Sequence, residues 1–440
     1  DKEDKYNALR DFLDKKHPKI KGVKTGDKII SSEDFKTEIP KIISNLDNSY
    51  IYIQGPPGTG KTYQASNAII QLLKQNKKIG ITGLSHKVIH NLLQRVEDMA
   101  KEKQFNFEGY KRGTLEDEDT VFNGEFIKTY EKDPVFMDAL KEKDVGQIFA
   151  GTKYHLASTF YDQKIDYLFI DEAGQVSLAD LISIGNIAKN IILIGDQNQL
   201  GQPIRGVHPN NSGQSILDYL LEGKDTIPED RGIFLNKTYR LNSILNEFIS
   251  SNFYEERLIC DERTDKRIIK FNKKSLIKND GIHYVEMNHK NNVQTSLEEF
   301  EVVKDLMKEM IGNEFDDNGS KRKLTVEDFL VISPYNTQVN LLISKLEEAK
   351  IKNPRVGTID KFQGQEAPVT IISMTSSDSD SLPRNKEFFF SRNRLNVAIS
   401  RAQVASIILF NPNLLDSSPK NLDQIKLMNN FFKFLNFKKN

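Results

Sequence analysis

The fold is decided by the stretch YIYIQGPPGTGKTYQASNAIIQLLKQ, residues 50–75. Its centre, GPPGTGKT at 55–62, fits the pattern G-x-x-x-x-G-K-[ST] of a phosphate-binding loop. In such a loop the glycines allow backbone N–H groups to surround a phosphate, and the lysine reaches the same group. The apolar run 50–54 indicates a buried strand, and 63–75 has helical periodicity. Because the motif stands between a strand and a helix, as the chemistry requires, we predict a phosphate loop in an α/β domain.

The same alternation continues on both sides of this stretch. Apolar strands separated by helices indicate a parallel α/β architecture. In the first half of the chain we predict strands at 50–54, 77–84, 165–173 and 190–196, and helices at 34–46, 63–75, 86–100 and 178–188. In the second half we predict strands at 281–287, 329–335, 355–359, 368–375 and 404–410, and helices at 297–311, 337–351, 391–403 and 424–437. Two α/β units of similar size follow from this pattern.

A charged interval at about 100–146 interrupts the first unit. It contains TLEDEDTVFNGEF (114–126), and we predict an inserted segment, with a solvated excursion as the favoured interpretation. A length of 440 residues fits two domains and such an insertion. We therefore divide the chain into a linker or N-terminal extension (1–33), a first domain with the insertion (34–238) and a second domain (239–440).

Composition limits the class of protein. The 62 Lys and Arg balance 62 Asp and Glu, so any nucleic-acid track must be a local patch rather than a consequence of bulk charge. No apolar run approaches the roughly eighteen residues of a membrane span, and the first residues have no signal-peptide pattern. The single cysteine, Cys260, excludes an internal disulfide framework and a cysteine-rich zinc site. We expect a protein of the reducing cytoplasm without a membrane partner.

Two carboxylates end the predicted strand in YLFIDEAGQ (167–175). Asp171 would hold a hydrated Mg²⁺, and Glu172 would act as general base on the attacking water. An Asp-Glu pair at a strand end is weak by itself, but here it follows Lys61 of a phosphate loop by 110 residues. No [N/T]-K-x-D motif for reading guanine occurs in the chain, which favours ATP over GTP.

Two further stretches carry polar groups at the ends of apolar elements. In ILIGDQNQLGQP (192–203) an amide at the strand end could contact both a γ-phosphate and a bound water. In SRNRLNVAISRAQ (391–403) a half-buried helix ends in Arg401. Taken alone, this arginine is best interpreted as a surface or dipole-pairing charge. Arg392 and Arg394 are interpreted as surface or interdomain charges.

The order of these motifs resembles that of the superfamily 1B helicases. The motifs are GPPGTGKT, DEAGQ, GDQNQLGQP, TYRLN, VGTIDKFQGQE and RLNVAISRA, and they span residues 55–402. Their wording is most similar to the helicase half of bacterial proteins that fuse a RecB-like nuclease to a helicase. Those proteins are similar in turn to the eukaryotic flap-processing nuclease-helicase and to the nonsense-mediated-decay helicase. The resemblance implies two tandem RecA-like P-loop domains with parallel sheets, and ATP and Mg²⁺ in the cleft between them. It also implies a nuclease domain upstream of Asp1, so that this chain would be a fragment or a stand-alone relative.

The resemblance assigns roles residue by residue. It implies catalytic roles for Lys61, Glu172, Gln199, Arg240 and Arg401, the two arginines reaching the γ-phosphate and Gln199 sensing it. It implies ATP binding by Gly55, Pro56, Pro57, Gly58, Thr59, Gly60, Lys61 and Thr62, with Tyr239 against the adenine or the hinge and Glu366 at the ribose or phosphate network. Thr62 and Asp171 would hold Mg²⁺. Single-stranded nucleic acid would be contacted near Ser85, His86, Lys87, Gly151, Thr152, Pro334, Tyr335, Asn336 and Thr358.

The chain departs from the family pattern at three places. No glutamine stands upstream of the phosphate loop where it would read adenine, no room exists before Gly55 for the family's accessory barrel, and TYRLN (238–242) differs from the usual fourth motif. The functional expectation is a monomeric ATP-driven translocase and helicase on single-stranded nucleic acid, DNA preferred over RNA, with the 5′ to 3′ polarity implied by the family. An ATP-gated clamp and an RNA-directed remodeller remain alternatives. No spaced cluster of Asp and Glu-x-Lys indicates a nuclease site within the chain.

Overall fold

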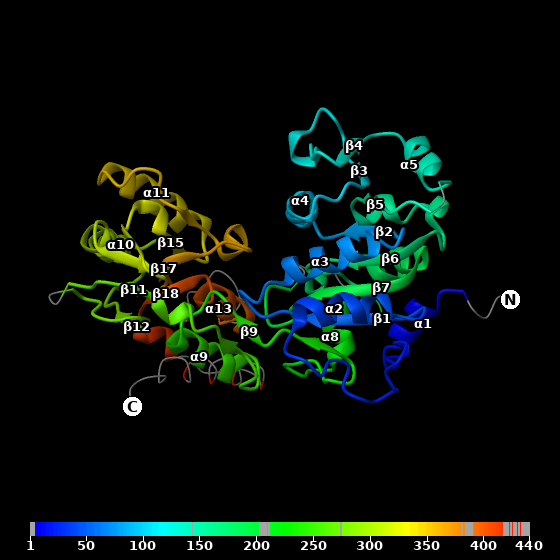
Figure 1. Ribbon diagram of the computed structural model, residues 1–440. Coiled ribbons are helices and arrows are strands. Elements are labelled where there is room, and N and C mark those ends of the chain that lie inside the picture. The colour runs from blue at the N-terminus through cyan, green and yellow to red at the C-terminus, as the bar shows by residue number, and fades with distance from the viewer. Residues whose placement is uncertain are drawn as a thin grey trace. The chain divides into compact units, whose positions relative to one another are not determined.

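The structure is a computed structural model that describes residues 5–142, 144–201, 209, 212–272, 275–379, 382, 390–416, 422, 425, 429 and 432. The chain forms two compact units, shown in Figure 1. Unit 1 comprises Asp1–Gly55, Gly60–Gln197 and Gly201–Leu235, and unit 2 comprises Pro56–Thr59, Asn198–Leu200 and Asn236–Asn440. The main chain thus passes from unit 1 to unit 2 between Leu235 and Asn236, where we predicted a boundary after residue 238. Most of the predicted closing helix 424–437 lies outside the described residues.

A fully parallel sheet forms the centre of unit 1, with eight strands among the described residues. In sheet order the strands are β4 (Ile127–Tyr130), β3 (Glu108–Arg112), β5 (Gln147–Ala150), β2 (Lys78–Thr82), β6 (Ile165–Ile170), β7 (Ala188–Gly195), β1 (Tyr50–Gln54) and β8 (Gly232–Phe234). The helices are α1 (Asn7–Leu13), α2 (Phe35–Ser44), α3 (Lys61–Leu73), α4 (His86–Glu102), α5 (Asp133–Ala139), α6 (Lys153–Leu156), α7 (Leu178–Ile184) and α8 (Ile216–Leu221). Because all strands are parallel, their carboxyl ends lie at one edge of the sheet.

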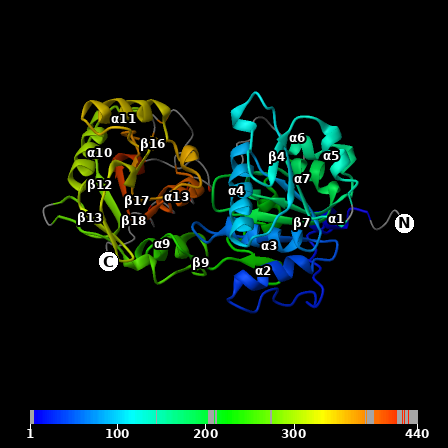
Figure 2. The same cartoon turned by 45° about the horizontal axis from the view of Figure 1, so that its top comes forward.

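The two faces of this sheet are buried by different helices. Alternate residues of the central strands, such as Ile51 and Ile53, share one core cluster with apolar residues of α2, α3 and α4. Helices α2 and α3 pack together, as do α3 and α4 (Figures 1 and 2). Tyr50 points to the other face, where its ring meets the edge of Phe12 of α1 at a centroid distance of 5.4 Å. Burial on both faces explains why the strands read as continuous apolar runs.

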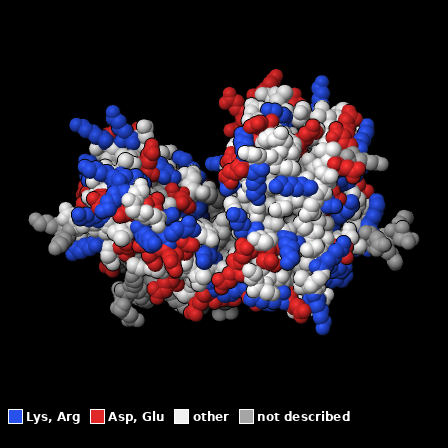
Figure 3. All heavy atoms as spheres, viewed as in Figure 1, with Lys and Arg blue, Asp and Glu red and all other residues white. Residues whose placement is uncertain are grey.

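The interval 100–146 is not the solvated excursion that the charge pattern suggested. It supplies β3, β4 and α5, and the two strands extend the parallel sheet at its edge. Phe136 and Ile127 are fully buried there. Acidic residues cluster in the connection between β3 and β4, where Glu116 to Asp119 are exposed, and acidic side chains gather at the top of unit 1 in Figure 3. This acidic loop joins two partly buried strands, so the average composition of the interval is highly charged although its strands belong to the sheet.

Residues 5–33 are packed rather than extended as a linker. Ala8 and Phe12 of α1 are buried, and α1 contacts β1 and β7. Ile20, Ile29 and Ile30 belong to the core cluster shared with α2 and α3. The segment is therefore an N-terminal extension that completes unit 1.

Unit 2 contains a second parallel sheet, with five strands in the part that is described. In sheet order these are β12 (Gly281–Glu286), β18 (Ala402–Phe410), β17 (Ala367–Ser373), β15 (Phe329–Ile332) and β16 (Val356–Gly357). The helices are α9 (Ser243–Phe253), α10 (Leu297–Met310), α11 (Asn336–Glu348) and α13 (Arg392–Ile399). Helices α10 and α11 pack against each other (Figures 1 and 2), and their apolar residues share a core cluster with β15, β17 and β18.

Two small sheets of unit 2 were not expected from the sequence. Antiparallel β11 (Arg267–Ile269), β13 (Glu314–Asp317) and β14 (Ser320–Lys323) form one, and parallel β9 (Lys237–Thr238) and β10 (Ile259–Cys260) form the other. Strand β14 is exposed throughout and consists of Ser320 followed by basic residues. Such a strand has no apolar alternation, which is the signal that a sequence-based prediction needs. No helix among the described residues is long and apolar enough to cross a membrane.

Candidate nucleotide and nucleic-acid sites

The phosphate loop connects the end of β1 to the start of α3. The backbone N–H of Gly55 donates to the carbonyl of Gly195 at 2.9 Å, which ties the loop to the end of β7. Gly60 caps α3 with a φ of 79°, a left-handed conformation that glycine adopts without strain. The Nζ of Lys61 donates to the carbonyl of Gly55 at 2.6 Å. The ammonium thus lies over the loop, where a phosphate oxygen could replace that carbonyl.

The middle of the loop is grouped with unit 2 and packs against the start of the TYRLN motif. The N–H of Tyr239 donates to the carbonyl of Gly58, and the hydroxyl of Thr238 donates to the carbonyl of Pro57, both at 2.9 Å. Gly58 has a φ of 74°, and a Cβ added there would lie 2.4 Å from the Cβ of Arg240. Only glycine fits this position. The backbone of Arg240, a predicted γ-phosphate ligand, therefore lies directly against the phosphate loop.

The predicted carboxylate pair follows β6 at the same edge of the sheet. The N–H of Asp171 donates to the carbonyl of Thr82 at the end of β2, at 3.0 Å. The N–H of Glu172 donates to a carboxylate oxygen of Asp171 at 2.9 Å. Glu172 adopts a φ of 51°, so the chain turns sharply after the strand. Burial, followed by the neighbouring charge of Glu172, raises the pKa of Asp171 to about 7, against the opposing effect of Lys61.

The residues present fit a divalent cation bound together with a nucleotide. Asp171 is only 6% exposed and has a second carboxylate as neighbour, an arrangement that a cation would relieve. Two buried polar atoms have no hydrogen-bond partner: Oγ1 of Thr82, whose carbonyl accepts from Asp171, and Nε2 of Gln175, four positions after Asp171. In the described part of the chain no group of three or more His, Cys, Asp or Glu could hold a metal. A Mg²⁺ at Thr62 and Asp171 would thus depend on phosphate oxygens and water for its other ligands.

The amides after β7 are divided between two environments. The Oε1 of Gln197 accepts from the hydroxyl of Tyr52 at 2.8 Å, and its Nε2 donates to the carbonyl of Asp225 at 2.6 Å, so this side chain is fixed within unit 1. Gln199, the predicted γ-phosphate sensor, is 4% exposed and its carbonyl accepts from Asn393 of α13 at 2.7 Å. The amide of Asn396 donates in the same way to the carbonyl of Asn198. Residues 198–200 are therefore held by α13 of unit 2.

Arg240 and Glu366, which the sequence assigned separately, form an ion pair. The Nε of Arg240 lies 2.5 Å from a carboxylate oxygen of Glu366, and one of its terminal nitrogens donates to the carbonyl of Ser400 at 3.2 Å. The other oxygen of Glu366 accepts from Gln403 at 2.8 Å. Burial alone would raise the pKa of Glu366, but the charge and hydrogen bond of Arg240 outweigh it, and the pKa is lowered.

Arg401 is almost fully buried in unit 2, with 2% of its surface exposed. Its Nε donates to the carbonyl of Val397 at 3.1 Å, and a terminal nitrogen donates to the carbonyl of Gln365 at 3.2 Å. The interpretation as a surface charge is therefore wrong. A guanidinium buried to this degree requires acceptors for its N–H groups, and these two carbonyls supply part of them.

Tyr239 remains the accessible aromatic residue of this region. Its ring is 46% exposed, although its backbone is bonded to the phosphate loop. The guanidinium of Arg263 lies 5.3 Å from the ring centroid. The exposed face is compatible with stacking on a base.

The predicted nucleic-acid residues of unit 1 lie at the carboxyl ends of two adjacent strands. Ser85 to Lys87 follow β2, and Gly151 and Thr152 follow β5, which pairs with β2. The N–H of Gly151 donates to the carbonyl of Ile81 at 3.1 Å. Ser85 caps α4 and is exposed, as is Lys87. The structure brings these residues together at the edge that also carries Asp171.

The side chain of His86 contacts a buried lysine. The Nζ of Lys111, at the end of β3, lies 2.7 Å from Nδ1 of His86 and also bonds to the carbonyl of Thr120. Lys111 is 0% exposed, and burial lowers its pKa to about 8 despite the opposing charge of Asp117. Burial and the charge of Lys111 lower the pKa of His86. Lys111 could not be identified from the sequence, because its role depends on tertiary contacts with His86 and Thr120.

The predicted nucleic-acid residues of unit 2 also follow two adjacent parallel strands. Pro334, Tyr335 and Asn336 follow β15, and Thr358 follows β16, which pairs with β15. Tyr335 is only 5% exposed, and its hydroxyl accepts from Ser376 at 3.3 Å. Its side chain thus belongs to the interior of unit 2, which leaves backbone atoms and the neighbouring polar side chains for contact.

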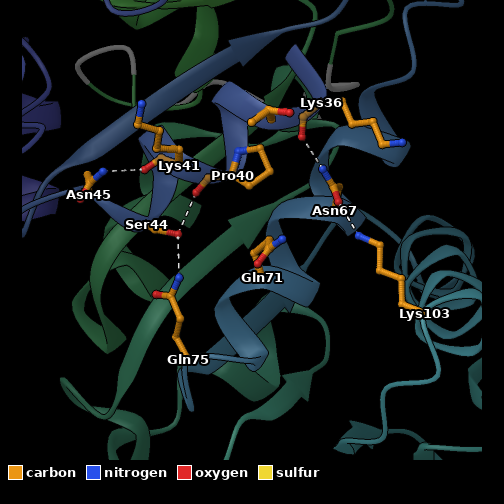
Figure 4. Close-up of a pocket in the computed structure, with 10 residues that line it drawn as sticks. Lys36, Pro40, Lys41, Ser44, Asn45, Asn67, Gln71, Gln75 and Lys103 are labelled. Carbon is orange, nitrogen blue, oxygen red and sulfur yellow. Dashed lines mark hydrogen bonds between the residues drawn. The ribbon is translucent and has the colours of Figure 1, made fainter. Parts of the chain in front are cut away.

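A separate polar pocket of about 580 Å³ lies between α2 and α3, close to the end of α4 (Figure 4). Its lining includes Lys36, Lys103 and Asn67, whose amide donates to the carbonyl of Lys36 and accepts from the ammonium of Lys103. None of the predicted site residues lines it. The polar groups of the pocket largely satisfy one another, as the dashed lines in Figure 4 show.

Comparison with known proteins gives matches over both units. Sequence profiles described as AAA domains match residues 40–203 and 213–413. The chain is 29% identical over 401 residues to the DNA replication ATP-dependent helicase/nuclease dna2 of Schizosaccharomyces pombe, covering 84% of this chain and 27% of that protein. It is 26% identical over 424 residues to the DNA polymerase alpha-associated DNA helicase A of the same organism, covering 79% and 59%. It is 24% identical over 436 residues to the probable RNA helicase armi of Drosophila melanogaster, covering 82% and 35%.

Each of these relatives is longer than this chain, which matches only part of it. It spans between 27% and 59% of the length of the three relatives. The two profiles fall on two parallel α/β units, and the phosphate loop follows β1 of the first, which is the organisation of tandem RecA-like domains. Motif order, domain matches and relatives agree in indicating a superfamily 1B helicase, of the group that contains the helicase/nuclease dna2.

Proposed function

We propose that this chain is an ATP-driven motor that moves 5′ to 3′ along single-stranded DNA and separates duplexes. One observation carries the proposal. In unit 1, the proposed nucleotide-binding residues follow β1 and β6, and the proposed nucleic-acid residues follow β2 and β5, so both sets share one edge of a single sheet. The hydrogen bond from Asp171 to Thr82 joins the two sets directly. A change at the γ-phosphate can therefore reach the nucleic-acid loops through one strand end.

We propose that the residues of unit 1 bind the nucleotide and activate the water that hydrolyses it. Lys61 and the N-terminus of α3 bind the phosphates, and Thr62 and Asp171 would hold Mg²⁺. When bound, Mg²⁺ supplies positive charge against the β- and γ-phosphate oxygens. The carboxylate of Glu172 accepts a proton from the attacking water, whose oxygen bonds to the γ-phosphorus as the bond to the bridging oxygen breaks.

Arg240 and Arg401 are the proposed γ-phosphate ligands of unit 2. Arg240 lies against Gly58 of the phosphate loop, which supports its role. Its guanidinium is held by Glu366, so that residue acts in this proposal by orienting Arg240 rather than by touching ribose. Arginine suits the task because its planar fork stays charged at any physiological pH. Gln199 is proposed to sense the γ-phosphate, and Tyr239 to stack on adenine.

The Glu172→Gln variant tests the hydrolytic part of the proposal. It should bind ATP as the wild type does, while ATP hydrolysis falls by about 10²- to 10⁴-fold because the general base is lost. Fluorescent-nucleotide binding and phosphate release measure the two properties. Glu102→Gln, an exposed carboxylate on α4, is the matched control and should change neither. Normal hydrolysis by Glu172→Gln would remove the proposed base.

The motor part is tested by unwinding of tailed duplexes. ATP hydrolysis should rise many-fold with single strands, and a duplex with a 5′ tail should be separated in preference to one with a 3′ tail. Stimulated hydrolysis without strand separation would instead support an ATP-gated clamp. Unwinding from the 3′ tail would overturn the polarity.

A second candidate, an RNA-directed remodeller, is favoured by the relative named as an RNA helicase. The two differ in whether 2′-hydroxyl groups are read. Competition between DNA and RNA oligonucleotides of the same sequence separates them, and the DNA motor requires the DNA to compete better.

The remaining parts of the proposal concern the whole protein. We propose a monomer of the reducing cytoplasm that acts in DNA repair, recombination or defence. We also propose a nuclease domain elsewhere in the full-length protein, since relatives named helicase/nuclease are much longer than this chain. The closeness to bacterial RecB-like nuclease-helicase fusions stays a prediction. The sequence of the full-length gene product tests both.

A further inference from the structure

The most exposed large aromatic side chain of unit 1, among the described residues, lies beside the predicted nucleic-acid residues. Tyr154 of α6 is 82% exposed, far more than Leu84 at 42% or Met137 at 43%. The ammonium of Lys153 lies 5.4 Å from the ring centroid. A tyrosine exposed to this degree has its ring accessible to a ligand.

Tyr154 is held outward by the rest of α6. The next residue, His155, is buried in an aromatic cluster, with its ring 4.5 Å from that of Phe136 and its Nε2 2.8 Å from the hydroxyl of Tyr161. Burial, followed by the charge of Arg112, lowers the pKa of His155 to about 4, so it stays neutral in this cluster. Leu156 is fully buried as well. With two consecutive residues anchored in the interior, the preceding side chain must point to solvent.

The backbone that carries Tyr154 is fixed to the sheet. A Cβ added to Gly151 would lie 2.9 Å from the ring of His155, so the turn from β5 into α6 is as tight as glycine allows. The N–H groups of His155 and Leu156 both donate to the carbonyl of Thr152. The ammonium of Lys153 donates to Asp180 of α7 at 2.7 Å. The backbone of Tyr154 is thus fixed by hydrogen bonds and packing of its neighbours, and its ring projects from a defined position.

The neighbouring loop presents groups of complementary chemistry. It follows β2, which pairs with β5 in parallel with Ile81 opposite Ala150. Adjacent parallel strands lie roughly 4.8 Å apart, so the loops that follow them begin side by side. After β2 the exposed residues are Leu84, Ser85 and Lys87. An exposed aromatic ring beside a hydroxyl and a lysine is the combination that single-stranded nucleic acid requires, because bases stack and phosphates need charge.

We propose that Tyr154 is a nucleobase-binding site, on which one base of the bound single strand stacks. The inference rests on the proposed function and assigns a residue that the motif-based contacts, made by backbone and hydroxyl groups, do not include. A π-face accepts any base, so the site adds affinity without adding sequence preference. It also predicts that bases, and not phosphates alone, contribute to binding at this edge.

Two substitutions at this position separate stacking from structure. Tyr154→Ala should weaken binding of a fluorescein-labelled oligothymidylate about tenfold, because base–aromatic stacking is lost. Tyr154→Phe retains the ring and should bind within about twofold of the wild type. Circular-dichroism melting should show both variants folded, since the side chain has no hydrogen bond or ring contact in the described structure beyond Lys153.

The absence of tryptophan from the chain provides a direct reporter. Tyr154→Trp creates a single tryptophan, whose fluorescence should be quenched when oligothymidylate stacks on it. An abasic oligomer of the same length and charge should bind more weakly and should not quench. Val145→Trp is the matched control: Val145 is 37% exposed but precedes β5, so it lies at the opposite edge of the sheet, and it should not be quenched.

The outcomes distinguish this inference from the proposed function. Equal affinity of Tyr154→Ala and wild type, or equal quenching of the two tryptophan variants, would overturn the stacking site while leaving the motor intact. If the wild type bound no single strand under any nucleotide condition, the proposed function would fail and the stacking site with it. Tenfold weaker binding with rescue by phenylalanine supports both.

Discussion

At the scale of single residues, buried charged side chains are held by partners from distant parts of the chain, as Lys111 is by His86 and Arg240 by Glu366. The phosphate loop and the pair Asp171–Glu172 were identifiable because a glycine-rich motif and a strand-terminal carboxylate pair leave a local pattern. The ion pair between Arg240 and Glu366 joins residues 126 positions apart and therefore leaves no local pattern in the sequence. Gln403 and Lys111 were missed for the same reason: their roles depend on tertiary contacts that no local spacing reports.

Arg401→Ala tests the role of the buried arginine. We expect stimulated ATP hydrolysis to fall by about 10³- to 10⁵-fold, because an arginine that stabilises the transferred phosphoryl group is lost. ATP binding should be largely kept, since Lys61 and α3 supply it. The free energy of unfolding should also fall by about 1–3 kcal/mol, because the carbonyls of Val397 and Gln365 lose a donor. Single-turnover hydrolysis, nucleotide binding and urea unfolding measure the three effects.

Arg394→Ala is the control for this prediction. Arg394 lies on α13 only seven positions earlier and pairs with Asp360 at 3.3 Å near the surface. Its removal should leave hydrolysis within about twofold, because exposed ion pairs contribute little. Hydrolysis at the wild-type rate by Arg401→Ala would return Arg401 to a purely structural role.

Because burial lowers the pKa of Lys111, we expect the free energy of unfolding to depend on pH. The pKa of Lys111 is about 8 in the folded chain, whereas its ordinary value is 10.5. At pH values between about 8 and 10.5 the unfolded chain therefore binds more protons than the folded chain. The free energy of unfolding should therefore rise with pH from about 8 to 10.5, by at most about 1.4 kcal/mol per pH unit. Below pH 8 the full penalty of the buried charge is present.

Lys111→Met removes this titration while keeping the volume of the side chain. The difference in unfolding free energy between wild type and variant, measured by urea unfolding across the pH range, isolates the lysine from the tyrosines that titrate nearby. The variant should be the more stable below pH 8, and the difference should shrink toward pH 10.5. A difference that does not change with pH would mean that Lys111 is not buried as a charge.

At the scale of elements, apolar periodicity predicted many of the strands and helices that bury a face, but it missed the short buried strand β5 and the helix α9. The expected strands at 50–54, 190–196 and 404–410 correspond to β1, β7 and β18, which are buried along almost their whole length. The edge strand β4 and its neighbour β3 were missed because each buries only part of its residues. Charge averaged over a window cannot distinguish a solvated segment from a half-buried pair of strands joined by an acidic loop.

The β3–β4 extension depends on a buried carboxylate of α4. Glu97 is 1% exposed, and its two oxygens accept from the N–H groups of Glu125, Phe126 and Ile127 at 2.8–2.9 Å. Glu97→Gln should lower the free energy of unfolding by about 2 kcal/mol, because charge-assisted bonds to three backbone donors are weakened and an amide hydrogen faces one of them. Urea unfolding gives the value, and hydrogen exchange should show faster exchange at residues 122–130.

Lys101→Gln provides a comparison on the same helix. Its exposed ion pair with Glu125 at 3.3 Å connects α4 to the same loop, but at the surface. We expect a change within about 0.5 kcal/mol. Equal effects of the two substitutions would show that the loop is held by surface charge instead of by the buried carboxylate.

At the scale of the whole molecule, the balance of charge determines how a strand can be held. The chain has no net charge, and Figure 3 shows basic and acidic side chains interspersed over the face in view. Long-range attraction to a polyanion is therefore weak, and affinity must come from a few local contacts. The proposed nucleotide residues and strand-contacting residues share one sheet edge in unit 1, so we expect those contacts to respond to nucleotide state.

The salt dependence of binding tests this view through Lys87, an exposed lysine at the start of α4. Each phosphate neutralised on a single strand contributes about −0.7 to the slope of log K against log salt. A chain that relies on stacking and few charges should show a shallow slope, and Lys87→Ala should reduce its magnitude by about 0.7. Lys101→Ala, at the far end of the same helix, should leave the slope unchanged. Because Tyr154→Ala removes a base contact and no charge, it should lower affinity equally at all salt concentrations. A steep slope that Lys87→Ala does not alter would place the phosphate contacts elsewhere and would separate the strand from the sheet edge at which nucleotide state is read.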